Sequence, residues 1–256
     1  MTDIPDIIRF IKRLASESAK VINPLFAKPD LVVEWKEDQT PVTLADRKAE
    51  EVMRELISRE FPDHGIIGEE FGEDSPHAEY TWILDPIDGT RSFAAGCPLF
   101  GTLICLRRQG KPIWGALHLP AMGKLYLGDN KTCWCNDRPT TLRKPPPLKD
   151  CFLLTTDPKT PGQHHNPAGW EALVAATGPY RTWGDCFGYT LLVSGGADIM
   201  TDSILNLWDI AALLPILRGA GAALSDWYGG VPDGSRGLVT AHPAIHPEVI
   251  KLLNCG

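Results

Sequence analysis

The stretch from Trp82 to Phe93 constrains this chain more than any other part of its sequence. It reads Trp-Ile-Leu-Asp-Pro-Ile-Asp-Gly-Thr-Arg-Ser-Phe, so an apolar run leads directly into two aspartates that lie three residues apart. The Pro and Gly beside them predict a turn at the end of a strand. Carboxylates and backbone carbonyls are the oxygen ligands that Mg²⁺ prefers, and the ion commonly shares them with substrate phosphates. The segment therefore indicates a site for a divalent cation and a phosphate group.

The composition is typical of an ordinary globular protein, with 43% hydrophobic and 22% charged residues. A formal net charge of −7 and the lack of a Lys/Arg cluster argue against nucleic acid as a partner. We expect no membrane partner either, because no apolar run is long enough to span a bilayer. The first residues resemble neither a secretory nor a transit segment, and seven cysteines favour reduced thiols. A cytoplasmic location is expected.

Hydrophobic spacing and turn residues predict a layered α/β protein with two halves. Apolar residues recur at helical spacing over 4–22, and a second helix is predicted from a cap at Thr43 to just before Pro62. Apolar runs joined by turn residues predict antiparallel hairpins over 99–127. The three prolines at 145–147 predict an extended linker. This linker divides an N-terminal α+β half with an antiparallel sheet (1–145) from a C-terminal α/β half (146–256).

Further strands and helices are predicted on both sides of the linker. In the first half, strands at 31–35, 66–67 and 81–84 are expected, and the last two lead directly into acidic residues. In the second half, strands alternate with helices, a pattern typical of layered α/β folds. The predicted strands there are 151–155, 197–201, 222–226 and 238–241, and the predicted helices are 169–176, 187–194, 209–219 and 247–253.

Acidic residues stand at four predicted element boundaries. Side chains at such boundaries converge on a ligand more easily than side chains in the middle of a helix. A single acidic pair is more often a solvated surface feature, and Glu50–Glu51 is interpreted as an exposed helix face. The combination is what predicts a metal site, and its members are Asp46, Glu69, Glu70, Asp85, Asp88 and Asp209.

In order and spacing, these motifs resemble the inositol monophosphatase superfamily of Mg²⁺-dependent sugar-phosphate phosphatases. The Asp-Pro-Ile-Asp-Gly-Thr run that begins at Asp85 and the late Trp208–Asp209 pair are the most specific, and the resemblance covers nearly the whole chain. It implies the layered αβαβα sugar-phosphatase fold. The segments 90–104 and 184–189 are closer to the histidinol-phosphate phosphatase branch than to true inositol phosphatases.

The resemblance implies roles for individual residues around two to three Mg²⁺ ions, for which Mn²⁺ is an acceptable substitute. A first ion would be bound by Glu69, Asp85 and the Ile87 carbonyl. A second would be bound by Asp85, Asp88 and Asp209. A third, weaker ion would be held by Glu69 and water, with the catalytic Glu70 close by.

The resemblance also implies how the substrate is held and attacked. The amides of Gly89 and Thr90 would bind phosphate oxygens, and Asp46 with the Thr90 hydroxyl would accept a proton from metal-bound water. Gly184 and Asp185 would line the pocket for the alcohol part of the substrate. Asp202 stands where the family commonly has a glutamate, one methylene longer. The segment 205–209 also departs from the usual sequence of the branch, so the identity of the leaving group stays open.

The expected function is hydrolysis of L-histidinol phosphate by direct attack of water, without a phosphoenzyme. Its partner is a small phosphomonoester, and the family is usually homodimeric. One alternative is a phosphatase for inositol-1-phosphate or another small sugar or nucleotide monophosphate. The other, of a different class, is a non-catalytic protein that binds Mg²⁺ or phosphate. Binding alone needs no water-activating pair, so Asp46 and Thr90 argue against that second alternative.

Overall fold

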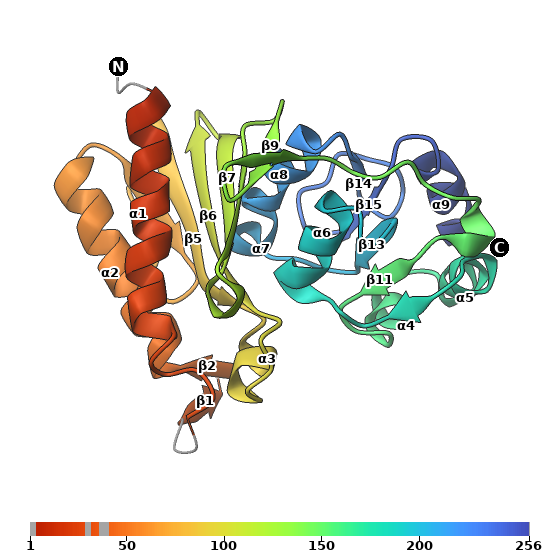
Figure 1. Ribbon diagram of the computed structural model, residues 1–256, viewed down its shortest axis with the longest axis horizontal. Coiled ribbons are helices and arrows are strands. Elements are labelled where there is room, and N and C mark those ends of the chain that lie inside the picture. The colour runs from red at the N-terminus through yellow and green to blue at the C-terminus, as the bar shows by residue number, and fades with distance from the viewer. Residues whose placement is uncertain (1–3, 29–31, 36–40, 256) are drawn as a thin grey trace.

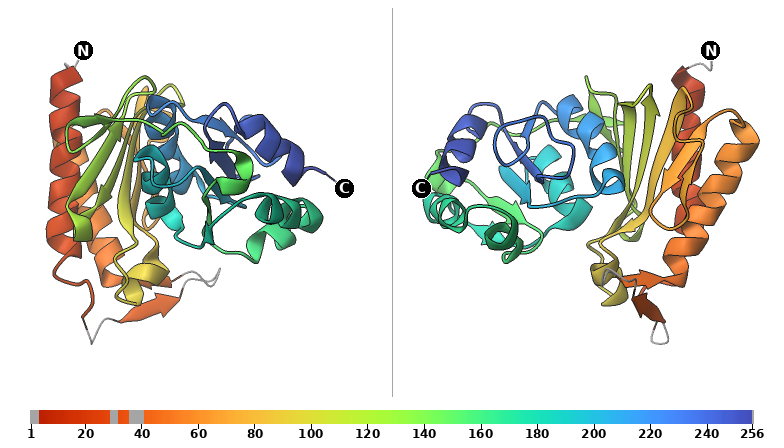
Figure 2. Two further views of the ribbon diagram at one scale, coloured as in Figure 1. Left: turned by 45° about the vertical axis from the view of Figure 1, so that its right-hand side comes forward. Right: turned by 180° about the vertical axis from the view of Figure 1, so that it is seen from behind.

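Five layers stack along the long axis of the molecule: helices, a large sheet, helices, a small sheet and helices (Figure 1). The structure is a computed structural model that describes residues 4–28, 32–35 and 41–255. Two further views show the same succession of layers (Figure 2). The predicted αβαβα architecture is therefore confirmed.

The first layer consists of α1 (Ile4–Ile22) and α2 (Leu44–Glu60), as predicted. The apolar stripe of α1 packs with α2 and with one face of the large sheet, where Trp82 and Leu84 meet it. Thr43 caps α2, because its hydroxyl accepts the Ala45 N–H. Before it lie β1 (Val33–Trp35) and β2 (Pro41–Thr43), which pair antiparallel. Residue 31, the predicted start of the first strand, lies outside the described residues.

The large sheet has the strand order β10-β9-β8-β7-β6-β5-β3-β4. The predicted hairpins are confirmed by antiparallel β6, β7 and β8, but β3 and β5 pair parallel, which the antiparallel prediction missed. Its strands are β3 (Gly65–Gly68), β4 (Gly72–Asp74), β5 (Tyr80–Asp88), β6 (Gly101–Arg108), β7 (Lys111–Leu119), β8 (Lys124–Gly128), β9 (Cys133–Cys135) and β10 (Arg138–Thr140).

A β-bulge in β5 decides where the two motif aspartates point. The predicted strand end at Leu84 is four residues too early, because β5 continues through Asp88. Asp85 pairs with Leu103 and Asp88 pairs with Gly101, so β5 uses one residue more than β6 over this stretch. Residues three apart on a regular strand point to opposite faces, and the extra residue places both aspartates on the same face. Pro86, which has no amide hydrogen, falls within the bulge, where strands tolerate proline.

The middle layer covers the opposite face of the large sheet. It consists of α6 (Asp185–Val193), α7 (Leu207–Ala211) and α8 (Leu213–Gly219). A single helix over 209–219 is a wrong prediction, because α7 ends at Ala211 and α8 begins at Leu213, although Ala212 between them keeps helical dihedral angles (φ −73°, ψ −31°). Pro215 has no N–H to donate to the Ala211 carbonyl, and its ring crowds that carbonyl, so the helix breaks one turn before it.

The small sheet has the order β12-β11-β13-β15-β14 and is mixed. β11 pairs parallel with β12 and β13, whereas β15 pairs antiparallel with β13 and β14. Its strands are β11 (Leu153–Thr155), β12 (Tyr180–Arg181), β13 (Ile199–Asp202), β14 (Ala223–Ser225) and β15 (Leu238–Ala241). The outer layer holds α4 (Thr160–His164), α5 (Pro167–Ala176) and α9 (His246–Leu253).

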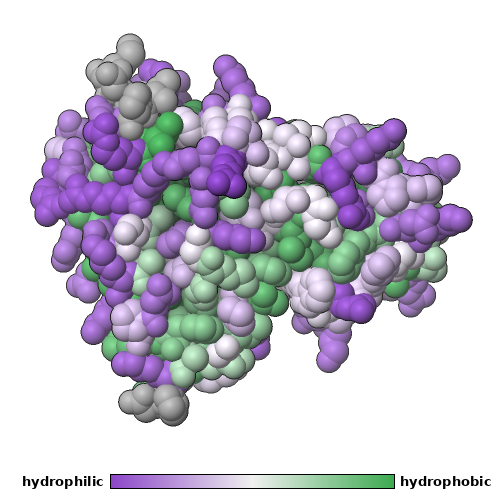
Figure 3. Space-filling model, viewed as in Figure 1, coloured by the Kyte–Doolittle hydropathy of each residue, from purple (hydrophilic) through white to green (hydrophobic). Residues whose placement is uncertain are grey.

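The two sheets draw on the two predicted halves, but the core does not divide there. The largest hydrophobic cluster joins Leu103 and Tyr126 of the large sheet to Leu154 and Met200 of the small one. The boundary between residues 145 and 146 therefore stays a prediction. On the face shown in Figure 3, hydrophobic and weakly polar residues gather across the middle and hydrophilic ones cover both ends. Among the described helices, none combines the length and the apolar character that crossing a membrane requires.

Candidate active site

Three carboxylates from two elements meet at the interface between the large sheet and the middle helices. Asp85 and Asp88 lie on β5, and Asp209 lies in the first turn of α7; each offers an oxygen within 4.8 Å of the others. Asp209 is fixed by the Asn206 N–H, which donates to its Oδ2 at 2.7 Å. Asp88 is fixed by the Cys186 N–H in the first turn of α6, where the helix dipole favours a negative charge.

The donor set fits a hard divalent cation. Asp85 is buried, and its Oδ1 has no hydrogen-bond partner among the described residues. A buried carboxylate oxygen without a partner is costly, and three neighbouring carboxylates repel one another. A cation such as Mg²⁺, which takes oxygen ligands, removes both penalties. Glu69 and Ile87, the other members of the predicted ligand set, line the same cavity.

Burial and mutual repulsion raise the pKa values of these carboxylates above their ordinary range. Burial raises the pKa of Asp85 well above its ordinary value, and the charges of Glu69 and Asp88 raise it further. The pKa of Asp88 is raised in the same way, by burial first and then by Asp185 and Asp209. Burial also raises the pKa of Asp209 to about 7. The cluster therefore favours either protons or a cation.

We expect the metal-free protein to lose stability as the pH rises from about 4 to about 7. An unfolded aspartate ionises near pH 3.8, whereas folded Asp209 ionises near pH 7, so only the folded state holds this proton within the window. The contribution of this proton to the stability of the folded state is therefore fully present below about pH 4 and lost above about pH 7. Because protons compete with the cation, Mg²⁺ should raise the Tm more at about pH 8 than at about pH 5. Calorimetry in EDTA and in Mg²⁺ measures this, and equal Tm shifts at both pH values would contradict it.

A cavity of about 180 Å³ lies in front of the carboxylates, and Gly89 and Thr90 line it. Gly89 has φ +86°, in the left-handed region, and begins α3 (Thr90–Ala94). A Cβ on Gly89 would lie 3.0 Å from the Leu99 carbonyl oxygen and 3.2 Å from Asp185 Oδ2, so only glycine fits without strain. The short turn thus brings backbone amides close to the carboxylate cluster.

Asp46 and Thr90, predicted as a proton-accepting pair, are brought together by the fold. Thr90 Oγ1 lies 3.3 Å from Asp46 Oδ1 and 2.9 Å from the Ile87 carbonyl oxygen. The other carboxylate oxygen of Asp46 accepts the Thr43 N–H at 2.8 Å and the Thr43 hydroxyl at 2.6 Å. Burial raises the pKa of Asp46 to about 6, and the bonds from Thr43 oppose that shift. Asp46 is therefore both a partner in the helix cap and a candidate base.

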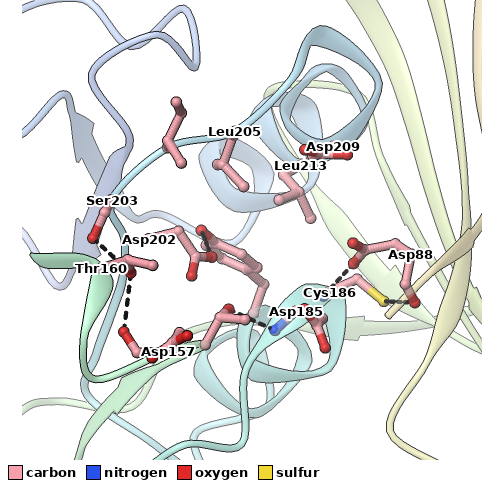
Figure 4. A pocket seen from close by; sticks show the side chains of 13 residues that line it. Asp88, Asp157, Thr160, Asp185, Cys186, Asp202, Ser203, Leu205, Asp209 and Leu213 are labelled. Carbon is pink, nitrogen blue, oxygen red and sulfur yellow. Dashed lines mark hydrogen bonds between the residues drawn. The ribbon is translucent and has the colours of Figure 1, made fainter. Parts of the chain in front are cut away.

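A second cavity of about 170 Å³ shares Asp88, Asp185 and Asp209 with the first (Figure 4). Asp157 and Asp202 line its far side, and no lysine or arginine is among its described lining residues. The Tyr189 hydroxyl donates to Asp202 Oδ2 at 2.7 Å. Burial raises the pKa of Asp202 to about 7. This cavity is acidic and lies on the side opposite the Gly89–Thr90 turn.

Asp185 stands between the two cavities in a strained conformation. Its φ is +47°, which a non-glycine residue seldom adopts. The Asp185 N–H donates to Thr156 Oγ1 at 2.8 Å, and a Cβ on Gly184 would lie 2.2 Å from the Thr156 Cα. Burial raises the pKa of Asp185 to about 6, against the influence of Arg91. Gly184 lines neither cavity, so its contribution is the close backbone approach that places Asp185.

The glutamates after β3 are separated by the fold. Glu69 lines the first cavity, whereas Glu70 lines neither. The interpretation of Glu50 as exposed is wrong: its side chain is fully buried and accepts the Glu70 N–H at 2.8 Å. One signal was available, because Glu50 lies four residues after Asp46 and so shares its helix face.

The sequence also left other lining residues without a role. Tyr189 ends the 184–189 segment that carries part of the family resemblance, and only the structure shows that its hydroxyl binds Asp202. Asp157 follows the predicted strand 151–155 by two residues, as Glu69 follows 66–67, so its place at an element boundary was an available signal, although it belongs to no family motif. Arg91 lines the first cavity and lies inside the segment 90–104, but the sequence predicted no role for it.

Comparisons with known proteins agree on one family. The chain matches the family model described as "Inositol monophosphatase family" over residues 3–255. It is 37% identical to a histidinol-phosphatase of Chlorobaculum parvum, with 98% of each chain covered. It is 34% identical to an inositol-1-monophosphatase of Mesorhizobium japonicum, over 78% of this chain and 77% of that one. A solved inositol monophosphatase from Zymomonas mobilis superposes on all of both chains with a TM-score of 0.86 at 32% identity.

Proposed function

The chain belongs to the inositol monophosphatase family of phosphoric monoester hydrolases, which use divalent metal ions, and from this premise we propose that it hydrolyses L-histidinol phosphate to L-histidinol and phosphate with Mg²⁺. The observation that carries the choice of substrate is the acidic second cavity, which has no cationic lining residue. The expected homodimer and the cytoplasmic location stay predictions.

We assign the predicted ligand set to the clustered carboxylates. Glu69, Asp85 and the Ile87 carbonyl would hold one ion, Asp85, Asp88 and Asp209 a second, and Glu69 with water a third. Mg²⁺ held there supplies charge neutralisation for the phosphate dianion and lowers the pKa of water. The orphaned Asp85 Oδ1 supports this assignment, since it lacks a partner within the described chain.

The chain's own residues then hold the phosphate and move the proton. We assign the Gly89 and Thr90 amides to phosphate oxygens, since the left-handed turn presents backbone there. As the oxygen of water attacks phosphorus, its proton passes to the Thr90–Asp46 pair. The ester P–O bond breaks, and the departing oxygen keeps the electron pair and takes up a proton from solvent water, while the Thr90–Asp46 pair returns its proton to solvent. A pKa of about 6 makes Asp46 a better proton acceptor than an ordinary aspartate, while leaving it mostly ionised at neutral pH.

The acidic cavity favours a cationic leaving group. Buried Asp202, half-buried Asp185 and exposed Asp157 line it, and burying carboxylates without a cationic partner is costly. L-Histidinol carries an ammonium group and an imidazole, whereas inositol is neutral. Attraction between opposite charges is strengthened in a partly buried site. A substrate with a positively charged alcohol part would therefore complete this cavity.

Inositol-1-phosphate remains the second candidate. The Tyr189 hydroxyl donates its hydrogen to Asp202, so this pair offers acceptor oxygens to sugar hydroxyls. The non-catalytic alternative fits less well, because a protein that only binds phosphate has no use for the Thr90–Asp46 pair at its metal site.

We expect kcat/KM for phosphate release in Mg²⁺ to be at least about tenfold higher for L-histidinol phosphate than for myo-inositol-1-phosphate. A tenfold preference corresponds to roughly 1.4 kcal/mol of discrimination between the two substrates. Asp202→Asn, which keeps an acceptor for Tyr189 but removes the charge, should lower kcat/KM for histidinol phosphate by roughly tenfold or more. The same change should leave inositol phosphate hydrolysis within a few-fold. Asp63→Asn on the surface is the matched control. Equal or reversed preference in the unmodified chain would replace the first candidate with the second.

A further inference from the structure

Helix α2 carries a second carboxylate, four residues after Asp46, that faces the loop after Glu69. The Glu50 side chain is fully buried, although it is charged and its neighbour Glu51 is exposed. We infer that Glu50 is a positioning residue, which holds the Glu69 loop in the conformation that binds the cation. This inference rests on the proposed function, because it takes Glu69 as a metal ligand.

Glu50 takes hydrogen bonds from successive residues of that loop. Its Oε2 accepts the Glu70 N–H at 2.8 Å, and its Oε1 accepts the Phe71 N–H at 3.2 Å. Oε1 also accepts Arg54 Nε at 2.8 Å, and the Arg54 guanidinium donates to the Gly72 carbonyl. The ion pair of Glu50 and Arg54 thus clamps residues 70–72 through their backbone, whatever their side chains are.

The other end of the loop is held by the sheet. Glu69 follows β3 directly, and its N–H donates to the Leu84 carbonyl at 3.2 Å, one residue before Asp85. A Cβ on Gly68 would lie 1.9 Å from Glu50 Oε1, so the carboxylate and the strand end fit only because residue 68 is glycine. The backbone around Glu69 is therefore held on one side by β5 and on the other by α2, and Glu69 lines the first cavity.

One helix face thereby positions two parts of the site. Asp46 contacts Thr90, and Glu50 one turn later contacts the backbone after Glu69. Because residues four apart on a helix keep a fixed separation, α2 sets the distance between the proton acceptor and the metal-ligand loop. Each Glu50 carboxylate oxygen accepts one N–H of the loop. Glutamine replaces one of these oxygens by an NH2 group, which cannot accept, so at least one loop N–H loses its partner. The loss of a group that supports a metal ligand typically lowers the metal affinity by about 10–100-fold.

The test compares Glu50→Gln with the matched control Glu51→Gln, which removes a charge from the adjacent exposed position. We expect Glu50→Gln to raise the half-saturating Mg²⁺ concentration for phosphate release by about 10–100-fold. Saturating Mg²⁺ should restore most of kcat. Calorimetric titration with Mn²⁺, without substrate, should show the same loss of affinity. In the metal-free protein, the amides of residues 69–72 should exchange with deuterium faster in Glu50→Gln and at the unmodified rate in Glu51→Gln.

Other outcomes overturn the inference. A variant with lower Tm and lower kcat but an unchanged half-saturating Mg²⁺ concentration would give Glu50 a merely structural role. If Glu50→Gln does not fold, Arg54→Gln should raise that concentration several-fold, and an unchanged value would count against the clamp. An unmodified chain that neither binds nor needs a divalent cation would overturn the proposed function, and this inference with it.

Discussion

Asp88→Asn should lower turnover by about a thousandfold or more while the fold stays intact. Asp88 belongs to the carboxylate cluster with Asp85 and Asp209, and the change removes one negative charge from the cation's ligands. Metal ions contribute several kcal/mol of transition-state stabilisation in such reactions, and each 1.4 kcal/mol or so is a factor of ten in rate. The asparagine oxygen can still accept the Cys186 N–H, so the packing of α6 against β5 should persist. Steady-state phosphate release over a range of Mg²⁺ concentrations measures the loss.

Stability gives Asp88→Asn an independent signature. Because the charge of Asp88 raises the pKa of Asp85, its removal relieves repulsion inside the metal-free site. The Tm of the metal-free variant should equal or exceed that of the unmodified chain, and Mg²⁺ should raise it less. Asp63→Asn, a surface change of the same chemistry, should alter neither quantity. Unchanged turnover in Asp88→Asn would show that the metal site is assigned to the wrong residues.

Asp46→Asn should lower kcat by about 10²–10⁴-fold, the usual contribution of a positioned general base. Asp46 is the carboxylate within reach of the Thr90 hydroxyl, and asparagine cannot take up the proton. The asparagine oxygen can replace the acceptor for the Thr43 N–H, so α2 should keep its cap. The half-saturating Mg²⁺ concentration should change only a few-fold, which separates this variant from Asp88→Asn and Glu50→Gln.

The pH profile tests the same assignment. The unmodified chain should lose kcat as the pH falls through the pKa of Asp46, which lies at about 6, because the protonated acid accepts no further proton. Cation binding nearby would move this limb to lower pH, and Asp46→Asn should abolish it. Thr90→Val should reduce kcat, whereas Thr90→Ser, which keeps the hydroxyl, should retain most of it. A normal kcat and an unchanged acid limb in Asp46→Asn would assign proton transfer to another group.

Features that depend on neighbouring residues along the chain could be predicted from the sequence. The helix over 4–22 follows from apolar periodicity, and the start of α2 follows from the chemistry of a threonine cap. The hairpins β6–β8 follow from turn residues between apolar runs. The motif at 85–90 identified the carboxylates that the fold brings together, because cation chemistry restricts which residue types can serve.

Features that depend on contacts between distant segments were decided only by the tertiary structure. The bulge that turns Asp88 toward Asp85 exists because β5 must keep pairing with β6 beyond Pro86. Glu50 is buried because the loop after β3 directs the N–H groups of residues 70 and 71 at it, which lie 20 and 21 residues away along the chain. Asp185, in a left-handed conformation, donates its N–H to Thr156, which directly follows β11. Local patterns thus predicted the helices, the hairpins and the residue types of the site, and the family resemblance implied the order of the layers. The register, the burial of charge and the strained backbone arise from long-range packing, which no local pattern encodes.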